Sequence, residues 1–441
     1  MSIGLILTVG YSPEPLIFSI EEYAPEYVVF VGTSSSINKV IDRVVESTAL
    51  RPSQYFKLEV TDHSEAIGEV CQKIQEAVKK LKDRNVEKII CDPTGGKKWM
   101  SAGAIMVASA ANVEMIYVDA KYVDGKPSKD SMKIVPLGNA YDQTGFIYAE
   151  RGIVAFNSYD FSGAAEYFRG ITPVDSAKND LFQGLSKICE VLAKWDRFVY
   201  YDEKVSEPYT ELSFDLEKAF EQVNRALHNE HLKIHASNFC SYLDGISRII
   251  SFWKNIDGLE RSQKLFVFVV DVFMNGKRRI KRRRFDDAVA RFYRTLEAFG
   301  QYLLRDLYGI DSSNLTKDNL TESQLDAFLF LLGVEELPSK IDLVNVFLLL
   351  KVLENPIGEI VFKNPRAKTR KELYDSFSFR KLLSKRNESI LAHGFVSVSE
   401  KDCNDFQSKL EELFHELEIV GGSFFDLSKS LEIPDMPEIG F

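Results

Sequence analysis

Residues 86–98 read VEKIICDPTGGKK and are followed by an amphipathic stretch. The apolar run Val86–Cys91 predicts a buried strand, and Lys97–Ala111 predicts a helix. Between them, small residues let a ligand approach the backbone, while the helix N-terminus and two lysines favour an anion. This order of strand, glycine-containing loop and helix predicts a nucleotide or polyphosphate site in an α/β sheet.

The same alternation of strand and helix covers residues 1 to about 140. Short apolar runs, most of them rich in Val and Ile, predict strands at Ile3–Val9, Tyr27–Val31, Tyr55–Val60, Val86–Cys91 and Val113–Asp119. Amphipathic stretches predict helices at Ile37–Leu50, Ser64–Leu81 and Lys97–Ala111. Such alternation predicts a parallel sheet that is covered by helices on both faces.

Small and polar residues follow three of these strands. Gly10-Tyr11-Ser12-Pro13 follows the first strand, Gly32-Thr33-Ser34-Ser35-Ser36 the second, and the loop at residues 92–98 the fourth. Each loop alone is typical of an ordinary turn, but ligands bind beyond the carboxyl ends of parallel strands. We therefore expect the three loops to converge on one ligand site. Neither GxGxxG nor GxxxxGK[ST] is present, so the loops follow neither common nucleotide fingerprint.

The strand signals end near residue 145. Residues 146–260 predict a helical connector that includes a helix pair, Arg151–Gly170, broken near Asp160. Residues 261–441 predict a helical bundle. Its expected helices are Phe285–Leu307, Glu322–Leu332, Leu343–Leu353, Ser376–His393 and Asp402–Ile419. We expect the residues after Gly422 to lie on the surface.

Composition excludes several classes of protein. The 441 residues carry a net charge of −10, and no run approaches 18 uninterrupted apolar residues, so we expect no membrane span. Five scattered cysteines without a CxxC pair predict reduced thiols, a cytoplasmic setting and no structural zinc. His228, His231 and His235 could share a helix face, but without cysteine or carboxylate partners they predict surface histidines rather than a metal site.

One basic run departs from the acidic average. Seven of the eight residues Lys277–Arg284 are Lys or Arg. Such a run is either a solvated face or a patch that binds a polyanion.

The stretch RNESILAHG at residues 386–394 places two cations among apolar positions. In a helix that starts at Ser376 and ends at Gly394, Arg386 and His393 fall on one stripe with leucine and phenylalanine side chains. They are seven residues, about two turns, apart. Two interpretations are open. Because burying unpaired cations is costly, the two side chains could line a cleft or a subunit interface. Alternatively, the Arg386 side chain extends to solvent, and His393 is favoured by the dipole at the helix C-terminus.

Two motifs together resemble a known group of proteins. Residues 92–103, DPTGGKKWMSAG, resemble the signature loop and helix of CARF domains, the sensors of CRISPR-associated proteins. Arg386-Asn387 followed by His393 resembles the R-x(4–6)-H motif of HEPN ribonucleases, with six intervening residues. The stretch Arg283–Glu297 also resembles a helical region of this CARF–HEPN group.

This resemblance implies the domains and the activity. A Rossmann-like CARF domain (1–145), a helical connector (146–260) and an all-α HEPN domain (261–441) are expected. The implied activity is an endoribonuclease of type III CRISPR defence, which cyclic oligoadenylate activates and which cleaves single-stranded RNA without a metal ion or cofactor. The implied assembly is a homodimer in the cytoplasm, whose two HEPN motifs form one composite site.

The resemblance also assigns roles to residues. The residues implied to bind cyclic oligoadenylate are Gly10, Tyr11, Ser12, Thr33, Ser34, Ser35, Thr94, Gly95, Gly96, Lys97 and Lys98. His393 would transfer protons, and Arg386 would clamp the phosphate. Asn387 would orient His393 or a phosphate by hydrogen bonding. Trp99 and Met100 are expected to pack in the core.

Two alternatives stay open at this level. The helical part could be a non-catalytic interaction module attached to a nucleotide sensor. The chain could also be a nucleotide-binding α/β enzyme with a helical dimerisation domain, which the missing fingerprints disfavour.

Overall fold

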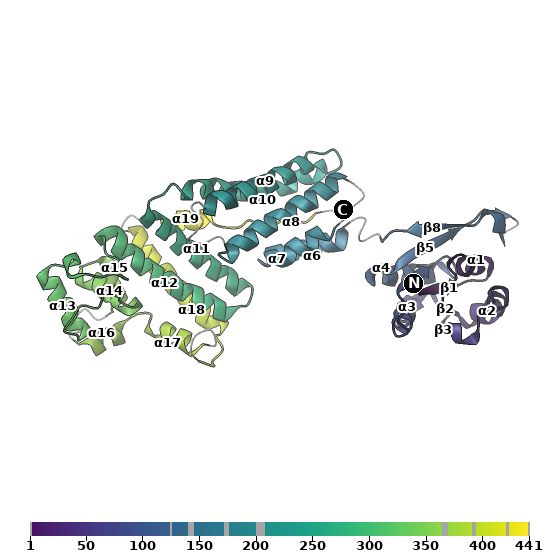
Figure 1. Cartoon of the computed structure of the whole chain (residues 1–441), viewed down its shortest axis with the longest axis horizontal. Helices are drawn as coiled ribbons and strands as arrows, with labels where there is room; N and C mark the ends of the chain where they lie inside the picture. Colours follow the sequence, from purple (N-terminus) through teal and green to yellow (C-terminus); the bar gives the residue numbers. More distant parts are fainter. Residues whose placement is uncertain are drawn as a thin grey trace. The chain divides into compact units, whose positions relative to one another are not determined.

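The computed structural model describes residues 2–123, 126–139, 145–171, 176–199, 208–363, 369–389, 394–419 and 423–439. The chain forms two compact units, Met1–Ile147 and Tyr148–Phe441 (Figure 1). Within the described ranges, no helix is long and apolar enough to cross a membrane.

The first unit is built on a six-stranded sheet of order β3-β2-β1-β4-β5-β8. Its strands are β1 (Ile3–Val9), β2 (Tyr27–Thr33), β3 (Tyr55–Val60), β4 (Lys88–Asp92), β5 (Glu114–Asp119) and β8 (Lys133–Leu137). The first five are parallel, and β8 pairs antiparallel with β5. A short hairpin of β6 (Tyr122–Val123) and β7 (Lys126–Pro127) precedes β8. The predicted Rossmann-like α/β fold is confirmed, with one antiparallel strand that the sequence did not indicate.

Helices cover both faces of this sheet (Figure 1). α1 (Glu14–Tyr23) and α2 (Ser34–Thr48) pack on one face, and α3 (Ile67–Lys82) and α4 (Lys98–Ala110) pack on the other. Alternate strand residues explain this division, because successive side chains in a strand point to opposite faces. Leu5 and Leu7 of β1 belong to the cluster with α1 and α2, whereas Ile6 belongs to the cluster with α3 and α4.

Among its described residues, the second unit consists of helices and connecting loops, and its β pairing is limited to isolated bridges. Its longer helices are α6 (Phe146–Asn157), α7 (Phe161–Arg169), α8 (Ser176–Asp196), α9 (Pro208–Leu227), α10 (Lys233–Ile256), α11 (Arg261–Lys281), α12 (Phe285–Tyr308), α13 (Glu322–Leu332), α14 (Leu343–Val352), α17 (Arg380–Glu388) and α18 (Glu400–Ile419). Three shorter helices are α15 (Pro356–Val361), α16 (Arg370–Ser376) and α19 (Phe424–Ser430). One buried cluster runs through residues 149–439, so the predicted connector and the predicted HEPN region share a core. The functional division at residue 260 stays a prediction.

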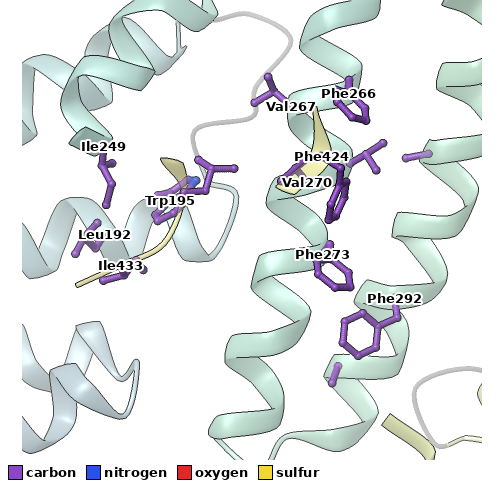
Figure 2. Packing of buried hydrophobic residues seen from close by; sticks show 14 of the residues in the cluster. Leu192, Trp195, Ile249, Phe266, Val267, Val270, Phe273, Phe292, Phe424 and Ile433 are labelled. Carbon is purple, nitrogen blue, oxygen red and sulfur yellow. The ribbon is translucent and has the colours of Figure 1, made fainter. Parts of the chain in front are cut away.

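Aromatic side chains fill the centre of this core. Figure 2 shows Phe266 and Phe273 of α11 beside Phe424 of α19, with Phe292 of α12 below them. Phe424 is fully buried, and its ring stacks on Phe414 of α18 at 3.6 Å between centroids. This packing fixes α12 and α18, and α17 lies against both of them.

The basic run Lys277–Arg284 contributes to this core. Arg278 and Arg279 are buried, and each forms an ion pair of 2.8 Å with the buried carboxylate of Asp196 at the end of α8. Other cations of the run have partners as well: Lys277 with Glu411, Lys281 with the Tyr159 hydroxyl, Arg282 with Asp160, and Arg284 with Asp287. Both interpretations of the basic run, a solvated face and a patch that binds a polyanion, are therefore wrong for Arg278 and Arg279.

The expectation that the residues after Gly422 lie on the surface is wrong for the segment 431–436. Leu431, Ile433 and Met436 are buried, and the amide of Asn157 exchanges two hydrogen bonds with the backbone of Met436. Pro434 packs so closely on Gly245 that a Cβ added to this glycine would clash with the proline ring. This segment completes the core between α6 and α10.

Candidate functional site

The loops after β1 and β4 meet at the carboxyl edge of the sheet. The order 3-2-1-4-5 reverses direction between β1 and β4, and ligands bind at such a switch point. A Cβ added to Gly10 would lie 2.6 Å from the backbone nitrogen of Gly96, and one added to Gly95 would clash with the carbonyl oxygen of Thr8. The predicted convergence of these two loops is therefore a backbone-to-backbone contact that only glycine permits.

The buried Asp92 side chain anchors the loop after β4 through hydrogen bonds. This carboxylate is fully buried and accepts hydrogen bonds from the Ser19 hydroxyl of α1 (2.6 Å), the Thr94 backbone N–H (2.9 Å) and the Thr94 hydroxyl. Burial raises the pKa of Asp92, and these donors oppose the rise. The Thr94 oxygen also accepts a hydrogen bond of 2.8 Å from the Val118 N–H. The Thr94 side chain therefore supports the loop from inside.

The solvent-exposed side of the same loop carries groups that can bind an anion. Gly96 has φ +86°, a conformation that glycine adopts without strain, and the chain then enters α4 without any side-chain cap at its N-terminus. Lys97 and Lys98 are exposed at this helix start. Trp99 and Met100 pack in the core as expected. Backbone N–H groups, the helix dipole and two ammonium groups thus coincide at one place.

The loop after β2 is shorter than expected because α2 begins at Ser34 rather than at Ile37. Thr33 is buried and caps the helix through a hydrogen bond from the Ser36 backbone N–H to its hydroxyl oxygen. Ser34 and Ser35 are exposed at the first turn, and the Ser34 hydroxyl donates to the Glu59 carboxylate.

Three charged residues that the sequence reasoning missed stand beside these loops. Lys39 of α2 lies 5.3 Å from the ring centroid of Tyr11, whose side chain is 61 % exposed. Asp62 pairs with Lys97, and its hydrogen bond raises the pKa of that lysine. Glu59 and Asp62 lie at the end of β3, on the same sheet edge as the other loops. Their position at the end of a parallel strand was the available signal in the sequence.

The second candidate site lies around α17, which differs from the prediction. The predicted single helix Ser376–His393 is wrong: Ser376 ends α16, α17 spans Arg380–Glu388, and Ser389 is extended with φ −74° and ψ 158°. Ser389 pairs with Val396 as an isolated parallel bridge, and the Val396 N–H donates to the Glu388 carbonyl at 3.0 Å. The shared stripe of Arg386 and His393 therefore does not exist as a continuous helix face.

Gly394 has a different role from the expected helix end. A Cβ added to it would clash with the carbonyl oxygen of Glu388, so only glycine fits where the chain returns to α17. Its N–H donates to the Ser389 carbonyl at 3.2 Å. The residue before it, His393, lies outside the described residues, as do Ile390–Ala392.

Arg386 is half-buried near the end of α17. Its guanidinium carbon lies 4.4 Å from the centroid of the Tyr293 ring on α12, and its Nη1 donates to the exposed Asn387 side chain at 3.1 Å. A guanidinium in this position can still offer donors to a phosphate, because a guanidinium has five N–H groups in a planar fork.

Metal ligation in proteins relies mainly on clusters of His, Cys, Asp and Glu side chains. Across the described ranges, no group of three or more such side chains is placed to hold an ion. His228 and His231 are exposed, as expected for surface histidines, while His235 is half-buried.

Residues 259–417 match the family model described as the Csm6 HEPN domain. This part of the chain is therefore similar to the HEPN domain of Csm6 proteins. The matched range includes Arg386, Asn387 and Gly394, as well as the position of His393. The resemblance of the chain to CARF–HEPN proteins of CRISPR systems is confirmed by this match together with the fold.

Solved structures extend the likeness to the whole chain. The chain is similar to Enterococcus italicus Csm6 bound to cyclic hexa-2′-fluoro-hexa-dAMP, with 11% identity, 98% coverage of both chains and a TM-score of 0.50. At this identity the likeness establishes the fold. Can2 from Sulfobacillus thermosulfidooxidans in complex with cyclic tetra-adenylate matches 45% of this chain and 68% of its own, with 12% identity and a TM-score of 0.24. Among curated proteins, none matches the chain.

Proposed function

We propose that this protein is a ribonuclease that cyclic oligoadenylate activates and that cleaves single-stranded RNA in type III CRISPR defence. One observation carries the proposal: a Csm6-type HEPN domain shares a chain with a parallel sheet whose switch point carries an anion-binding loop. A sensor and a nuclease in one chain suit control of RNA cleavage by a nucleotide messenger.

The proposed activator fits the chemistry of the sensor loops. A cyclic oligoadenylate presents a ring of phosphates and exposed adenine faces. The α4 N-terminus with Lys97 and Lys98 suits a phosphate, and the exposed Tyr11 ring beside Lys39 suits an adenine. Gly10, Gly95 and Gly96 bring the backbone close, and Ser12, Ser34 and Ser35 supply hydroxyl groups. Support for this ligand class also comes from the similar fold of Csm6 from Enterococcus italicus, which binds a cyclic hexanucleotide analogue.

A homodimer would complete both sites. The ligand ring repeats its nucleotides, so two copies of the loops related by a two-fold axis would each grip one half of it. Two copies of Arg386 and His393 would likewise form one composite RNA site. We expect multi-angle light scattering to give twice the chain mass of 50.2 kDa; a monomer that is fully active would contradict the shared sites.

The proposed cleavage uses the RNA itself as nucleophile. The 2′-hydroxyl attacks the adjacent phosphorus and the bond to the 5′-oxygen breaks, which leaves a 2′,3′-cyclic phosphate and a 5′-hydroxyl. His393 transfers the protons, Arg386 stabilises the developing negative charge, and Asn387 helps to hold Arg386 through their hydrogen bond. Since these side chains supply both proton transfer and charge stabilisation, we expect activity in EDTA.

The deciding experiment is a fluorogenic assay on single-stranded RNA with cyclic tri-, tetra- or hexa-adenylate. We expect one of these rings to switch cleavage on, and His393→Ala to abolish it. Cleavage with none of them would refute the ribonuclease proposal and favour a sensor with a non-catalytic helical module. Cleavage that survives His393→Ala would keep the function but refute the assigned residue.

A second variant tests the sensor loop by itself. Lys97→Ala with Lys98→Ala removes two positive charges at the α4 N-terminus, so we expect activator binding to weaken by at least tenfold. Lys79→Ala with Lys80→Ala, at the far end of α3, is a matched control for charge. Equal affinity of both double variants would remove the phosphate role from Lys97 and Lys98.

A further inference from the structure

Tyr293 lies beneath Arg386 although the two residues are far apart in the sequence. Its ring belongs to α12, is half-buried, and faces the guanidinium of α17 at 4.4 Å between the guanidinium carbon and the ring centroid. The two helices pack on one another directly. The hydrogen bond from Arg386 to Asn387 stays within α17, whereas the contact with Tyr293 ties the guanidinium to another helix.

The geometry suits an attraction between cation and ring. A guanidinium over the face of an aromatic ring within about 6 Å is attracted by the ring quadrupole, and the attraction grows when both groups are partly desolvated. Stacking of this kind engages the flat face of the guanidinium and leaves its edge donors available. An unstacked arginine at this position would sample several rotamers, and ordering it would oppose phosphate binding.

The Tyr293 hydroxyl is a poor candidate for proton transfer. Burial raises the pKa of Tyr293, and the charge of Glu297 adds to the rise while that of Arg386 opposes it. The phenol therefore stays protonated and neutral at physiological pH, and any role of this side chain must come from its ring.

We propose that Tyr293 is a positioning residue, whose ring holds the Arg386 guanidinium in one orientation with its edge toward the scissile phosphate. This inference rests on the ribonuclease function proposed above. Tyr293 does not touch the reacting atoms; it acts through Arg386. It follows that the ring, and not the hydroxyl, is required.

Three variants of α12 separate these roles in the activated RNA assay. Tyr293→Leu should lower kcat about 5- to 30-fold, the range expected for a partly desolvated cation–π contact, with a smaller change in KM. Tyr293→Phe keeps the ring and should retain kcat within about threefold. Tyr302→Leu is the matched control, because Tyr302 is also a half-buried tyrosine of α12, stacked on Phe266 at 4.7 Å, and we expect it to lose stability without losing kcat.

A binding cycle shows whether Tyr293 acts through Arg386. The probe is a fluorescent RNA with 2′-O-methyl groups, which binds but cannot be cleaved. Tyr293→Leu should weaken binding several-fold in the wild-type background and have no effect when Arg386 is already alanine. Equal losses in both backgrounds, or full activity of Tyr293→Leu, would overturn the inference. Loss of activity in Tyr293→Phe would overturn it too, since the hydroxyl would then be needed. If the wild-type protein cleaves no RNA, the proposed function fails first, and the two failures are thereby distinguished.

Discussion

Replacing Asp196 by alanine should destabilise the helical unit more than any surface charge change. The Asp196 carboxylate lies between Arg278 and Arg279 at 2.8 Å from each, and all three side chains are at most 5% exposed. Asn275 donates to the same carboxylate at 2.9 Å and to the Asp196 backbone carbonyl at 2.7 Å. The substitution leaves two buried guanidinium groups without this acceptor and opens a polar cavity.

The expected cost follows from this burial. Removing one partner of a buried ion pair costs about 3–5 kcal/mol, because the remaining charge stays away from water. With a dependence on urea of about 2–3 kcal/mol per molar for a large unit, the unfolding midpoint should fall by roughly 1–2 M. Asp287→Ala is the control, since Asp287 pairs with Arg284 at 2.7 Å near the surface, and such pairs contribute about 0–1 kcal/mol.

Tryptophan fluorescence can follow the helical unit alone. Of the three tryptophans, Trp99 lies in the sheet unit, while Trp195 and Trp253 pack edge to face at 5.1 Å in the helical unit. A Trp99→Phe background therefore restricts the signal to that unit. If Asp196→Ala and Asp287→Ala shift the urea midpoint equally, the buried pairs do not hold α8 to α11 and the reasoning fails.

Three further predictions follow from other contacts. Gly394→Ala places a Cβ against the Glu388 carbonyl, so RNA cleavage should fall at least tenfold while activator binding stays unchanged. Gly258→Ala is the control, because a Cβ at Gly258 would come no closer than 3.8 Å to the nearest atom, the Asn255 carbonyl oxygen. A Gly394→Ala variant with full activity would refute the claim that the close contact between Gly394 and Glu388 is needed. Thr94→Val leaves the buried Asp92 and the Val118 N–H without the hydroxyl, so the sheet unit should lose about 1–3 kcal/mol in calorimetry; unchanged stability with lost activator binding would mean a direct ligand contact instead. The hydroxyl and backbone N–H of Ser399 lower the pKa of Asp402, so this carboxylate stabilises the fold at neutral pH, and the contribution is lost as pH falls through the lowered pKa. Asp402→Asn should therefore lower Tm more at pH 7 than under acidic conditions, and an equal loss at every pH would contradict it.

The sheet could be predicted because its central strands are continuous apolar runs. Two elements of the first unit gave no such signal. Strand β8 is a short edge strand that contains Pro136, and α1 starts directly after Pro13 with no gap from the loop of β1. Their placement depends on pairing with β5 and packing on β1, which are contacts distant in sequence.

In the candidate sites too, some features could be predicted from local sequence, and others depend on contacts distant in sequence. That the loops after β1 and β4 meet followed from parallel strands, whereas the inward direction of the Thr94 hydroxyl depends on Val118, which lies 24 residues away. The spacing around Arg386 indicated one helix, because Ser389 has no local signal for an extended conformation. The bridge to Val396 and the return at Gly394 impose that conformation, and neither is visible in helical periodicity.

The packing of residues 431–436 constrains how the protein can be synthesised. Asn157 forms its hydrogen bonds with Met436, a residue 279 positions later, and Pro434 fills the space beside Gly245. The ribosome therefore releases α6 and α10 long before the segment that covers them is translated. Until then their apolar faces stay exposed on the nascent chain, which is the situation in which aggregation competes and chaperones act. Closure of the helical unit therefore waits until residues 431–436 are translated, and production of this protein should respond to chaperone supply and to growth temperature.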